Sequence, residues 1–368
     1  MKFIFTTLLC LLSLAANART VTDIAGRTVQ VPDKVERIVL GEGRMLTTIA
    51  MLEGAELTKR IVGIMDEFNS FDPDGYAQYI KRFPDIAKLP RIGQVSADSF
   101  SLEKTLALKP QLAIFVLAGH GPSIKDENIL KGMASAGIPV VFVNFRNNPL
   151  VNTPRSMRLL GQVLGREREA EAFAKFHETE LAKVTEGLRG LPRKTRVFIE
   201  SRVGLREECC ESMVQGVMQH FLDAAGGESV ARDVVPGEVG QVSPEYLLTH
   251  QPEVYIATAI GNRNSAQGNP LRIQMGASYT AAEAQASFNS RLQRMPVAAL
   301  SAVKNGRAFA IWHHFFHSPM NVVVVQAYAK WLHPDRFTKL DPNATLRTIY
   351  ERFQPVPYEG VYWTAGKP

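Results

Sequence analysis

The sequence lacks the features that mark several large classes of protein. Beyond its N-terminal segment, no stretch approaches the ~20 apolar residues that a membrane-spanning helix needs. The 42 Lys and Arg residues exceed the 36 Asp and Glu residues only slightly, giving a formal net charge of +6 without any concentrated basic run. The composition therefore does not indicate nucleic-acid binding, although a mildly basic chain can attract an acidic small ligand.

Motifs of common enzyme classes are missing as well. The chain has no G-x-S-x-G segment, no Gly-rich loop leading into Lys-Ser or Lys-Thr, and no H-E-x-x-H. No nucleophile–base pair stands out either. A binding protein therefore explains the sequence better than an enzyme does.

Cysteine is scarce, with only three residues in the chain. Cys10 lies in the N-terminal apolar segment, which leaves the neighbours Cys209 and Cys210. A free pair, a vicinal disulfide and an intermolecular link all remain open, as does a plain role as two small buried apolar side chains. An exported protein would meet oxidising conditions that favour a disulfide.

The first residues have the pattern of a secretory signal peptide. Lys2 precedes an apolar stretch at 3–14, and Ala16-Asn17-Ala18 gives a small-x-small cleavage pattern. Cys10 lacks the small residues expected just before a lipidated cysteine. We therefore predict cleavage near Ala18 and export of a soluble protein to the periplasm. About 350 residues remain, which is enough for two domains.

Strand-like and helix-like segments alternate along the chain. The first half has a hairpin at 21–31, strands at 37–40, 61–65, 112–117 and 140–145, and helices at 45–53, 101–108 and 127–136. The second half has strands at 196–200, 254–258 and 307–312, and helices at 213–225, 243–250, 322–332 and 344–353. This alternation predicts an α/β fold with mainly parallel, Rossmann-like sheets.

A long helical stretch separates the two halves. Residues 153–164 and 167–188 carry apolar positions at helical spacing, and a ~20-residue helix spans ~30 Å. We expect it to join two lobes as a stiff strut. The predicted division is a signal peptide at 1–18, an N-terminal lobe at 19–151, a helical connection at 152–190 and a C-terminal lobe at 191–368.

One segment occurs twice. Ser101, Glu103 and Pro110 recur as Ser243, Glu245 and Pro252, each 142 positions later, and both copies lead into an apolar strand. Two copies of one unit predict two similar lobes. A cleft between lobes is a typical site for a small ligand.

Polar and aromatic residues follow the predicted strands, where open α/β sheets bind their ligands. Arginine offers a planar fork for carboxylate, catecholate or phosphate oxygens, and aromatic rings offer flat contact area. The candidate ligand-binding residues are Arg44, Phe68, His120, Arg146, Arg202, Arg206, Cys209, Cys210, Arg263, Trp312, His313 and His314. The nearby acidic residues Glu42, Asp66 and Glu67 are more typical of helix caps or surface groups.

Three histidines at 313, 314 and 317 invite comparison with a metal site, because imidazole suits zinc and related ions. Neighbouring side chains at the end of a strand point in opposite directions, so we expect no metal site there. A secreted metal-dependent hydrolase using Asp66, His120 and these three histidines is the alternative from another functional class.

The order of several motifs resembles the periplasmic binding proteins for iron–siderophores and cobalamin. The motifs are the hairpin at 21–29 followed by Pro32 and Arg37-Ile38-Val39, both copies of the repeated segment, Ala224-Ala225-Gly226-Gly227, and Ala302-Val303-Lys304-Asn305-Gly306-Arg307. Their order and spacing cover almost the whole chain. The resemblance implies two lobes on a single helical backbone, no enzymatic activity, and delivery of a ligand to an ABC importer in the inner membrane.

The resemblance also assigns a role to the repeated glutamates. In that family one glutamate on each lobe docks against arginines of the permease, and these positions match Glu103 and Glu245. The simpler alternative is that each glutamate only favours the dipole of its own helix.

Ligand contacts vary within that family, so the ligand has to be inferred from the residues. The arginine-rich set favours an anionic iron chelate such as an Fe(III)-siderophore, with cobalamin or haem as alternatives. We expect a monomer without a resident cofactor, a metal site or a nucleic-acid partner. The pair Cys209-Cys210 departs from the family pattern, and we expect it to contact the ligand as a flat oxidised platform.

Overall fold

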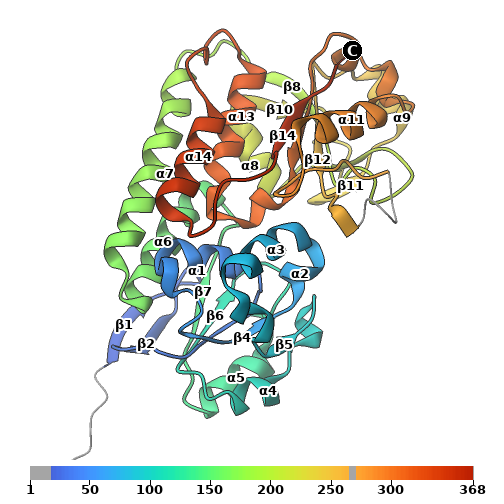
Figure 1. The fold of residues 1–368 in the computed structure, drawn as a ribbon. Coiled ribbons are helices and arrows are strands. Elements are labelled where there is room, and N and C mark those ends of the chain that lie inside the picture. The colour runs from blue at the N-terminus through green and yellow to red at the C-terminus, as the bar shows by residue number, and fades with distance from the viewer. Residues whose placement is uncertain (1–17, 265–270, 368) are drawn as a thin grey trace, which may run out of the picture.

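The computed structural model describes residues 18–264 and 271–367, arranged as two α/β lobes that lie one above the other in Figure 1. The predicted signal peptide lies outside the described residues except for Ala18, which begins a strand, so the cleavage site stays a prediction. None of the described helices combines the length and the apolar character needed to cross a membrane.

The N-terminal lobe is built on a parallel five-stranded sheet in the order β5-β4-β3-β6-β7. Its central strands are runs of buried Val, Ile, Leu and Phe, as expected for strands covered on both faces. The strands are β1 Ala18–Thr22 and β2 Thr28–Pro32, which form a separate hairpin, then β3 Ile38–Leu40, β4 Ile61–Met65, β5 Arg91–Gly93, β6 Leu112–Val116 and β7 Val140–Val143. The helices are α1 Met45–Glu53, η1 Gly54–Glu56, α2 Glu67–Phe71, α3 Pro73–Arg82, η2 Pro84–Lys88, η3 Ala97–Ser99, α4 Leu102–Ala107 and α5 Glu127–Ser135.

The C-terminal lobe has a mixed sheet in the order β11-β9-β8-β12-β13-β14, with β10 also paired to β8. Strands β10, β8, β12 and β13 run parallel, and β9, β11 and β14 are antiparallel additions at the edges. The strands are β8 Thr195–Glu200, β9 Glu211–Met213, β10 Gly227–Ser229, β11 Val239–Gln241, β12 Val254–Ala259, β13 Ala308–Trp312 and β14 Trp363–Ala365. The helices are α8 Val217–Ala224, α9 Pro244–Thr249, α11 Ala281–Leu292, η4 Val297–Ala299, α12 Ser301–Lys304, η5 His313–His317, η6 Pro319–Asn321, α13 Val322–Leu332 and α14 Pro342–Phe353. The predicted α/β class with parallel central sheets is confirmed.

Two of the sequence-based helix boundaries differ from the structure by four residues. The helix predicted at 153–164 begins at Pro149. The helix predicted at 213–225 begins only at Val217, and Met213 belongs to strand β9 instead. Met213 pairs with Val239 of β11, and Gly216 takes a φ of 76°, which a right-handed helix does not use. The tertiary pairing of a very short strand therefore overrides the local helical pattern.

Two antiparallel helices connect the lobes. Helix α6 (Pro149–Leu164) leads down from the end of β7, and α7 (Glu167–Gly187) returns alongside both lobes, as the long green helix of Figure 1 shows. The turn between them uses Gly165 in the left-handed conformation. Gly161 has no room for a side chain because Ala170 lies against it, so the two helices cross closely. The expected strut is thus a helical hairpin in which α7 is the long arm.

Buried polar contacts fasten this hairpin to the C-terminal lobe. Asn321 donates from its side-chain nitrogen to Thr153 Oγ1 of α6 at 2.8 Å, and its oxygen lies 2.8 Å from His177 Nε2 of α7. Gln326 of α13 donates to the Glu180 carboxylate of α7 at 2.9 Å. Because buried polar groups are costly to leave unpaired, these contacts fix how the second lobe sits on the connection.

The repeated segments adopt the same structure in both lobes. Ser101 Oγ accepts from the Lys104 backbone N at 3.2 Å, and Ser243 Oγ accepts from Tyr246 N at 3.1 Å, so both serines cap a six-residue helix. Glu103 and Glu245 therefore occupy the second position of α4 and α9, and both are exposed.

We expect Phe173→Ala to lower the free energy of unfolding by about 3–5 kcal/mol, the usual cost of truncating a buried phenylalanine. Phe173 of α7 is fully buried, and its ring lies 5.2 Å from that of Phe353 in α14. Urea denaturation measures the change. The control Thr179→Ala on the exposed side of α7 should stay within about 0.5 kcal/mol of the parent. Similar losses in both variants would contradict the assigned packing of α7.

Candidate functional site

A cavity of about 460 Å³ lies between the lobes, where the carboxyl ends of strands from both sheets meet. It is lined from the N-terminal lobe by Arg44, Ser70, Phe71, His120 and Arg146, and from the C-terminal lobe by Arg202, Leu205, Met213, Val239, Ile260, Asn262, Arg272, His313, His314 and Phe316. Four of these side chains are arginines, and none of the described lining residues is acidic. The cavity is therefore suited to an anion.

Arg44 is the most deeply placed of the arginines. It follows β3 and immediately precedes α1, and only 8% of the residue is exposed. Its Nε lies 4.0 Å from the Glu67 carboxylate, yet neither Nε nor Nη2 has a hydrogen-bond partner within the described parts of the chain. Buried charged donors without partners are costly, so the guanidinium is set up to receive oxygen atoms of an anion.

The other arginines approach the cavity from different sides. Arg146 reaches from the N-terminal lobe to the Glu238 carboxylate of the C-terminal lobe at 3.4 Å, and its guanidinium lies 5.7 Å from the centre of the Phe316 ring. Arg202 donates from Nε to Glu211 Oε1 at 3.1 Å. An anion in the cavity would therefore meet positive charge from both lobes.

The histidines of the cavity are neutral at pH 7. Burial, with a further contribution from Arg44, lowers the pKa of His120 to about 4 and that of His314 to about 3. The His120 ring lies between Phe71 of its own lobe, with ring centres 4.9 Å apart, and His317 of the other lobe, at 5.6 Å. The histidines therefore supply flat, uncharged surface and leave the positive charge to the arginines.

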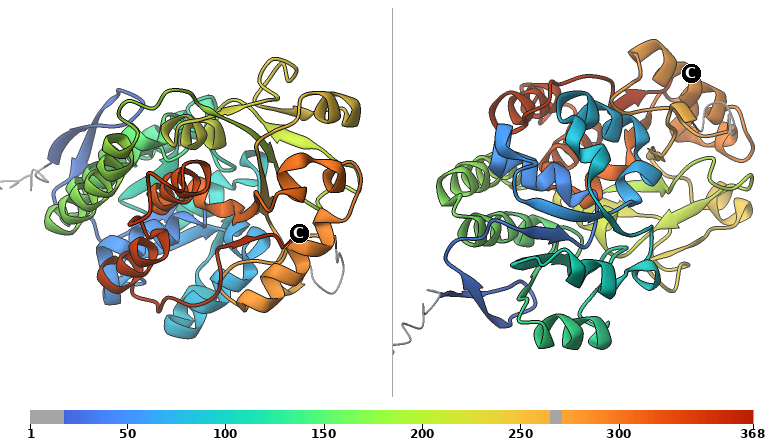
Figure 2. Two further views of the ribbon diagram at one scale, coloured as in Figure 1. Left: turned by 90° about the horizontal axis from the view of Figure 1, so that it is seen from above. Right: turned by 60° about the horizontal axis from the view of Figure 1, so that its bottom comes forward.

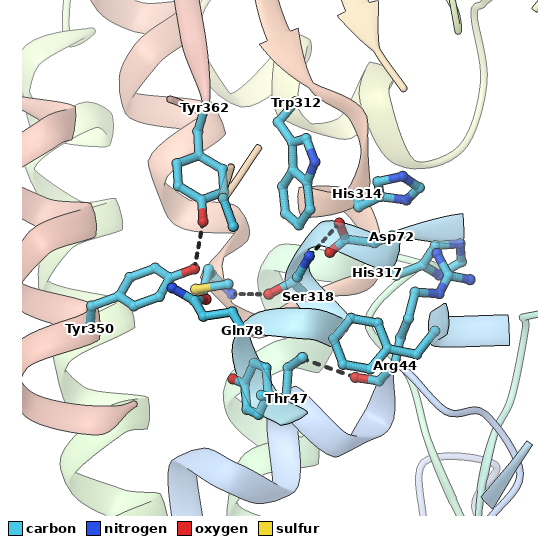
Figure 3. Close-up of a pocket in the computed structure, with 15 residues that line it drawn as sticks. Arg44, Thr47, Asp72, Gln78, Trp312, His314, His317, Ser318, Tyr350 and Tyr362 are labelled. Atoms are coloured by element: carbon cyan, nitrogen blue, oxygen red, sulfur yellow. Dashed lines mark hydrogen bonds between the residues drawn. The ribbon is translucent and has the colours of Figure 1, made fainter. Parts of the chain in front are cut away.

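A second, much smaller pocket of about 40 Å³ lies between the lobes and shares Arg44 and His314 with the main cavity (Figure 3). Figure 3 shows Arg44, His314 and His317 at one end and Tyr350 and Tyr362 at the other, with the two phenol oxygens 3.0 Å apart. Buried Asp72 accepts a hydrogen bond from Gly75 N at 3.1 Å, and burial raises the pKa of its carboxyl to about 7. This pocket therefore combines aromatic rings with a few buried polar groups.

The structure brings together half of the predicted ligand-binding residues. The six that line the main cavity are Arg44, His120, Arg146, Arg202, His313 and His314. Phe68 and Trp312 line the small inner pocket instead.

Four predicted residues line neither of these two spaces. The Arg206 side chain is 68% exposed, and Arg263 pairs with Glu283 at 2.7 Å. Cys209 and Cys210 form a disulfide beside Glu200. These residues were selected because they follow predicted strands. Their position in the chain does not determine the direction in which a loop points its side chains.

Several lining residues were missed. Phe71 and Phe316 each stand three residues or fewer from a predicted site residue, so extending the strand-end loops by one turn would have found them. Arg272 follows β12 by more than ten residues, and no local signal points to it.

Within residues 18–264 and 271–367, one group of three potential metal ligands has its ligand atoms within 4.8 Å of one another: Glu200, Cys209 and Cys210. The histidines of η5 point in different directions. His313 Nδ1 lies 3.0 Å from Thr258 Oγ1, whereas the His317 ring lies beside that of His120. Asp66 forms an ion pair with Arg91, in which Asp66 Oδ1 lies 2.7 Å from Arg91 Nε. The side chains assigned to the hydrolase alternative are thus not assembled into one centre.

Comparison with known families decides the class of protein. The family described as periplasmic binding protein matches residues 44–312. This chain belongs to that family. Its members are non-enzymatic, solute-binding components of ABC importers, so the predicted class is confirmed and the hydrolase alternative falls away.

Individual relatives support the same assignment. The molybdate-binding protein MolA of Haemophilus influenzae is 28% identical over 265 residues, which cover 68% of this chain and 71% of MolA. The solved structure of the TroA-like periplasmic binding protein FepB from Veillonella parvula has a TM-score of 0.84 at 22% identity and covers 95% of this chain and 99% of its own. The molybdate-bound structure of MolA has a TM-score of 0.66 at 18% identity, covering 93% and 99%. These two structural likenesses show the two-lobed fold.

The depressed pKa of His314 makes a testable statement about stability. Unfolding restores a pKa near 6.5, so between pH 6.5 and about 3 the unfolded chain binds a proton at this site that the folded chain does not. Stability contributed by neutral His314 is therefore lost as pH falls through this window. We expect His314→Gln to lose less stability than the parent between pH 7 and pH 4.5 in urea denaturation.

His250→Gln is the matched control, because this histidine is exposed on the surface of the C-terminal lobe. It should follow the parent at both pH values. Parallel loss of stability in His314→Gln and the parent would show that the imidazole is not held neutral by burial.

Proposed function

We propose that this binding protein captures an anionic metal chelate, with an Fe(III)-siderophore as the class that suits the site best. The observation that carries the proposal is the buried Arg44 guanidinium, whose Nε and Nη2 are unpartnered among the described residues at the wall of a cavity lined by three further arginines. Oxygen atoms bearing negative charge are the partners that arginine forks bind most strongly.

The remaining lining argues for an organic body on that anion. Phe71, Phe316 and Ile260 present apolar surface to the same cavity. A volume of about 460 Å³ lies within the range of sites for drug-sized molecules, roughly 300–1,000 Å³. A chelate that combines charged oxygens with an apolar or aromatic framework would use both kinds of surface.

Molybdate is a second candidate because the relative MolA is named for binding it. The arginines suit a tetrahedral oxyanion equally well. A four-oxygen ion would leave most of the cavity empty and the apolar side chains without a partner, so we place it second.

Haem and cobalamin stay as further alternatives. Neutral His120 and His314 offer ring nitrogens that could approach a haem iron. Four arginines are more positive charge than the two propionates of haem require, and cobalamin carries no comparable cluster of anionic oxygens. The charge of the cavity therefore favours the anionic chelate over both.

Binding to a panel of ligands tests this ranking. We expect an Fe(III) tris-catecholate or Fe(III)-hydroxamate to bind more tightly than molybdate or haemin in isothermal titration calorimetry. Arg44→Gln should weaken chelate binding by roughly 10- to 100-fold, the range expected for losing hydrogen bonds to a charged group. Arg168→Gln, at a side chain that is 92% exposed, serves as the control and should bind like the parent. Tight binding of molybdate with no binding of any chelate would replace the proposal.

We also propose that Glu103 and Glu245 dock the protein on its permease. Each stands at the second position of an exposed short helix, and no ion pair holds either within the described residues. Figure 1 shows α4 at the bottom of the lower lobe and α9 at the right of the upper lobe, so each lobe carries one of the two glutamate-bearing helices. Exposed charges of this kind steer and orient a partner more than they add affinity.

Reversing both charges separates docking from ligand capture. We expect Glu103→Arg with Glu245→Arg to abolish transport in cells while leaving the affinity for the chelate unchanged, because neither residue lines the cavity. The control pair Glu186→Arg with Glu351→Arg reverses two exposed charges on α7 and α14 and should transport normally. Undiminished uptake by the first pair would contradict the docking role.

A further inference from the structure

The disulfide between Cys209 and Cys210 has no part in the ligand contacts described above. It lies at the C-terminal end of segment 201–210, which connects β8 to β9. Cys210 is fully buried, whereas Cys209 is half-buried and reachable from the surface. The disulfide therefore lies at one end of a segment of which two other residues reach the main cavity.

Two side chains of segment 201–210, Arg202 and Leu205, line the main cavity. The Arg202 backbone has a φ of 51°, a left-handed conformation that residues other than glycine rarely adopt. It is held there by surrounding contacts, since its backbone N donates to Thr258 Oγ1 at 2.7 Å and the Val203 N donates to the Thr258 carbonyl at 3.1 Å. A residue in such a conformation keeps it only while those contacts persist.

Glu211 links the disulfide to the cavity. It follows Cys210 directly in the chain, and its carboxylate receives both Nε and Nη2 of Arg202, with Nε at 3.1 Å. Its carbonyl also accepts from Ser201 N at 2.7 Å. Any shift of Cys210 is therefore passed by one peptide bond to the group that orients the Arg202 guanidinium.

Neighbouring groups hold the backbone of both cysteines, and a buried carboxylate lies beside the two sulfurs. The Cys210 carbonyl accepts from Val242 N at 3.1 Å, and Gln241 donates its side-chain amide to the Cys209 carbonyl. The carboxylate of buried Glu200 lies within 4.8 Å of both sulfurs and accepts from Tyr255 Oη at 2.5 Å. Two unbonded thiol sulfurs cannot stay at bonding distance, so reduction must move at least one cysteine in this packed site.

We propose that Cys209–Cys210 is a dithiol-reducible site that sets the ligand affinity of the cavity through Glu211 and Arg202. A thiolate of a dithiol reductant attacks Sγ of Cys209, the less buried of the two cysteines, and the Cys210 thiolate leaves and takes up a proton. The second thiol of the reductant then displaces Cys209 and leaves as its own disulfide. Two electrons and two protons pass to the protein, and the freed Cys210 displaces Glu211 from Arg202.

The inference rests on the proposed function in treating the cavity as the ligand site. The probe is the gallium(III) tris-complex of 2,3-dihydroxybenzoate, because gallium does not change oxidation state under reducing conditions. Its affinity is measured by calorimetry for oxidised protein and for protein reduced with dithiothreitol and then desalted. We expect roughly tenfold weaker binding after reduction, in line with coupling between neighbouring groups, and recovery on reoxidation.

Two variants test the route through Glu211. Cys209→Ser with Cys210→Ser should bind as weakly as the reduced protein and ignore dithiothreitol. Glu211→Gln should bind weakly in both states and lose the response to reduction, whereas Glu207→Gln, at an exposed position of the same segment, should keep both the affinity and the response. Equal affinity of oxidised and reduced protein, or a full response in Glu211→Gln, would overturn the inference.

A separate readout covers failure of the proposed function itself. If the gallium chelate binds neither form, amide hydrogen exchange of residues 201–206 decides the matter. Faster exchange in the reduced protein supports the redox coupling, and unchanged exchange overturns it.

Discussion

The burial of a guanidinium whose hydrogen-bond donors are not all satisfied within the described chain is the constraint on which the rest of the site depends. Arg44 follows the end of β3, and Glu67 lies 4.0 Å from its Nε, yet Nε and Nη2 have no hydrogen-bond partner in the described chain. Leaving buried donors without partners is costly, and the oxygen atoms of an anion would remove that cost. The surrounding residues fit this requirement: three more arginines reach the cavity, and the neighbouring histidines are kept neutral by burial. In the small inner pocket, burial raises the pKa of the Asp72 carboxyl to about 7, which favours its neutral form. The cavity thus has positive charge and free hydrogen-bond donors that an anionic ligand can bind.

The fold explains why the arginine-lined cavity lies between the two lobes. Both lobes contribute residues that follow their parallel strands to the cavity. The two views of Figure 2 show α6 and α7, in green, along one side of the molecule. The helical hairpin is bonded to the second lobe through buried Asn321 and Gln326, which limits the ways in which the lobes can separate. Arg146 and Glu238 form an ion pair across the opening, so opening the cavity breaks a contact that an incoming anion could replace.

Much of this arrangement was predictable, because it follows from local rules. Arg44, His120, Arg146 and Arg202 each come just after a strand, and the rule that ligands bind at strand ends places all four at the cavity. Arg263 and Arg206 satisfy the same rule but turn toward Glu283 and solvent, because loop paths are set by tertiary contacts. Arg272 and strand β9 could not be predicted for the same reason. Arg272 lies far along a loop, and β9 forms through its pairing with β11. The repeat was a stronger signal, since equal spacing of Ser, Glu and Pro reproduced the same capped helix twice.

We propose that the cavity holds an organic, anionic iron chelate. Native mass spectrometry of the protein purified without denaturation from iron-limited cells, combined with metal analysis of the same sample, tests this most directly. We expect a bound complex that contains iron and an organic ligand with carboxylate, catecholate or hydroxamate oxygens. Bound molybdate or haem, or a ligand without anionic oxygen atoms, would contradict it.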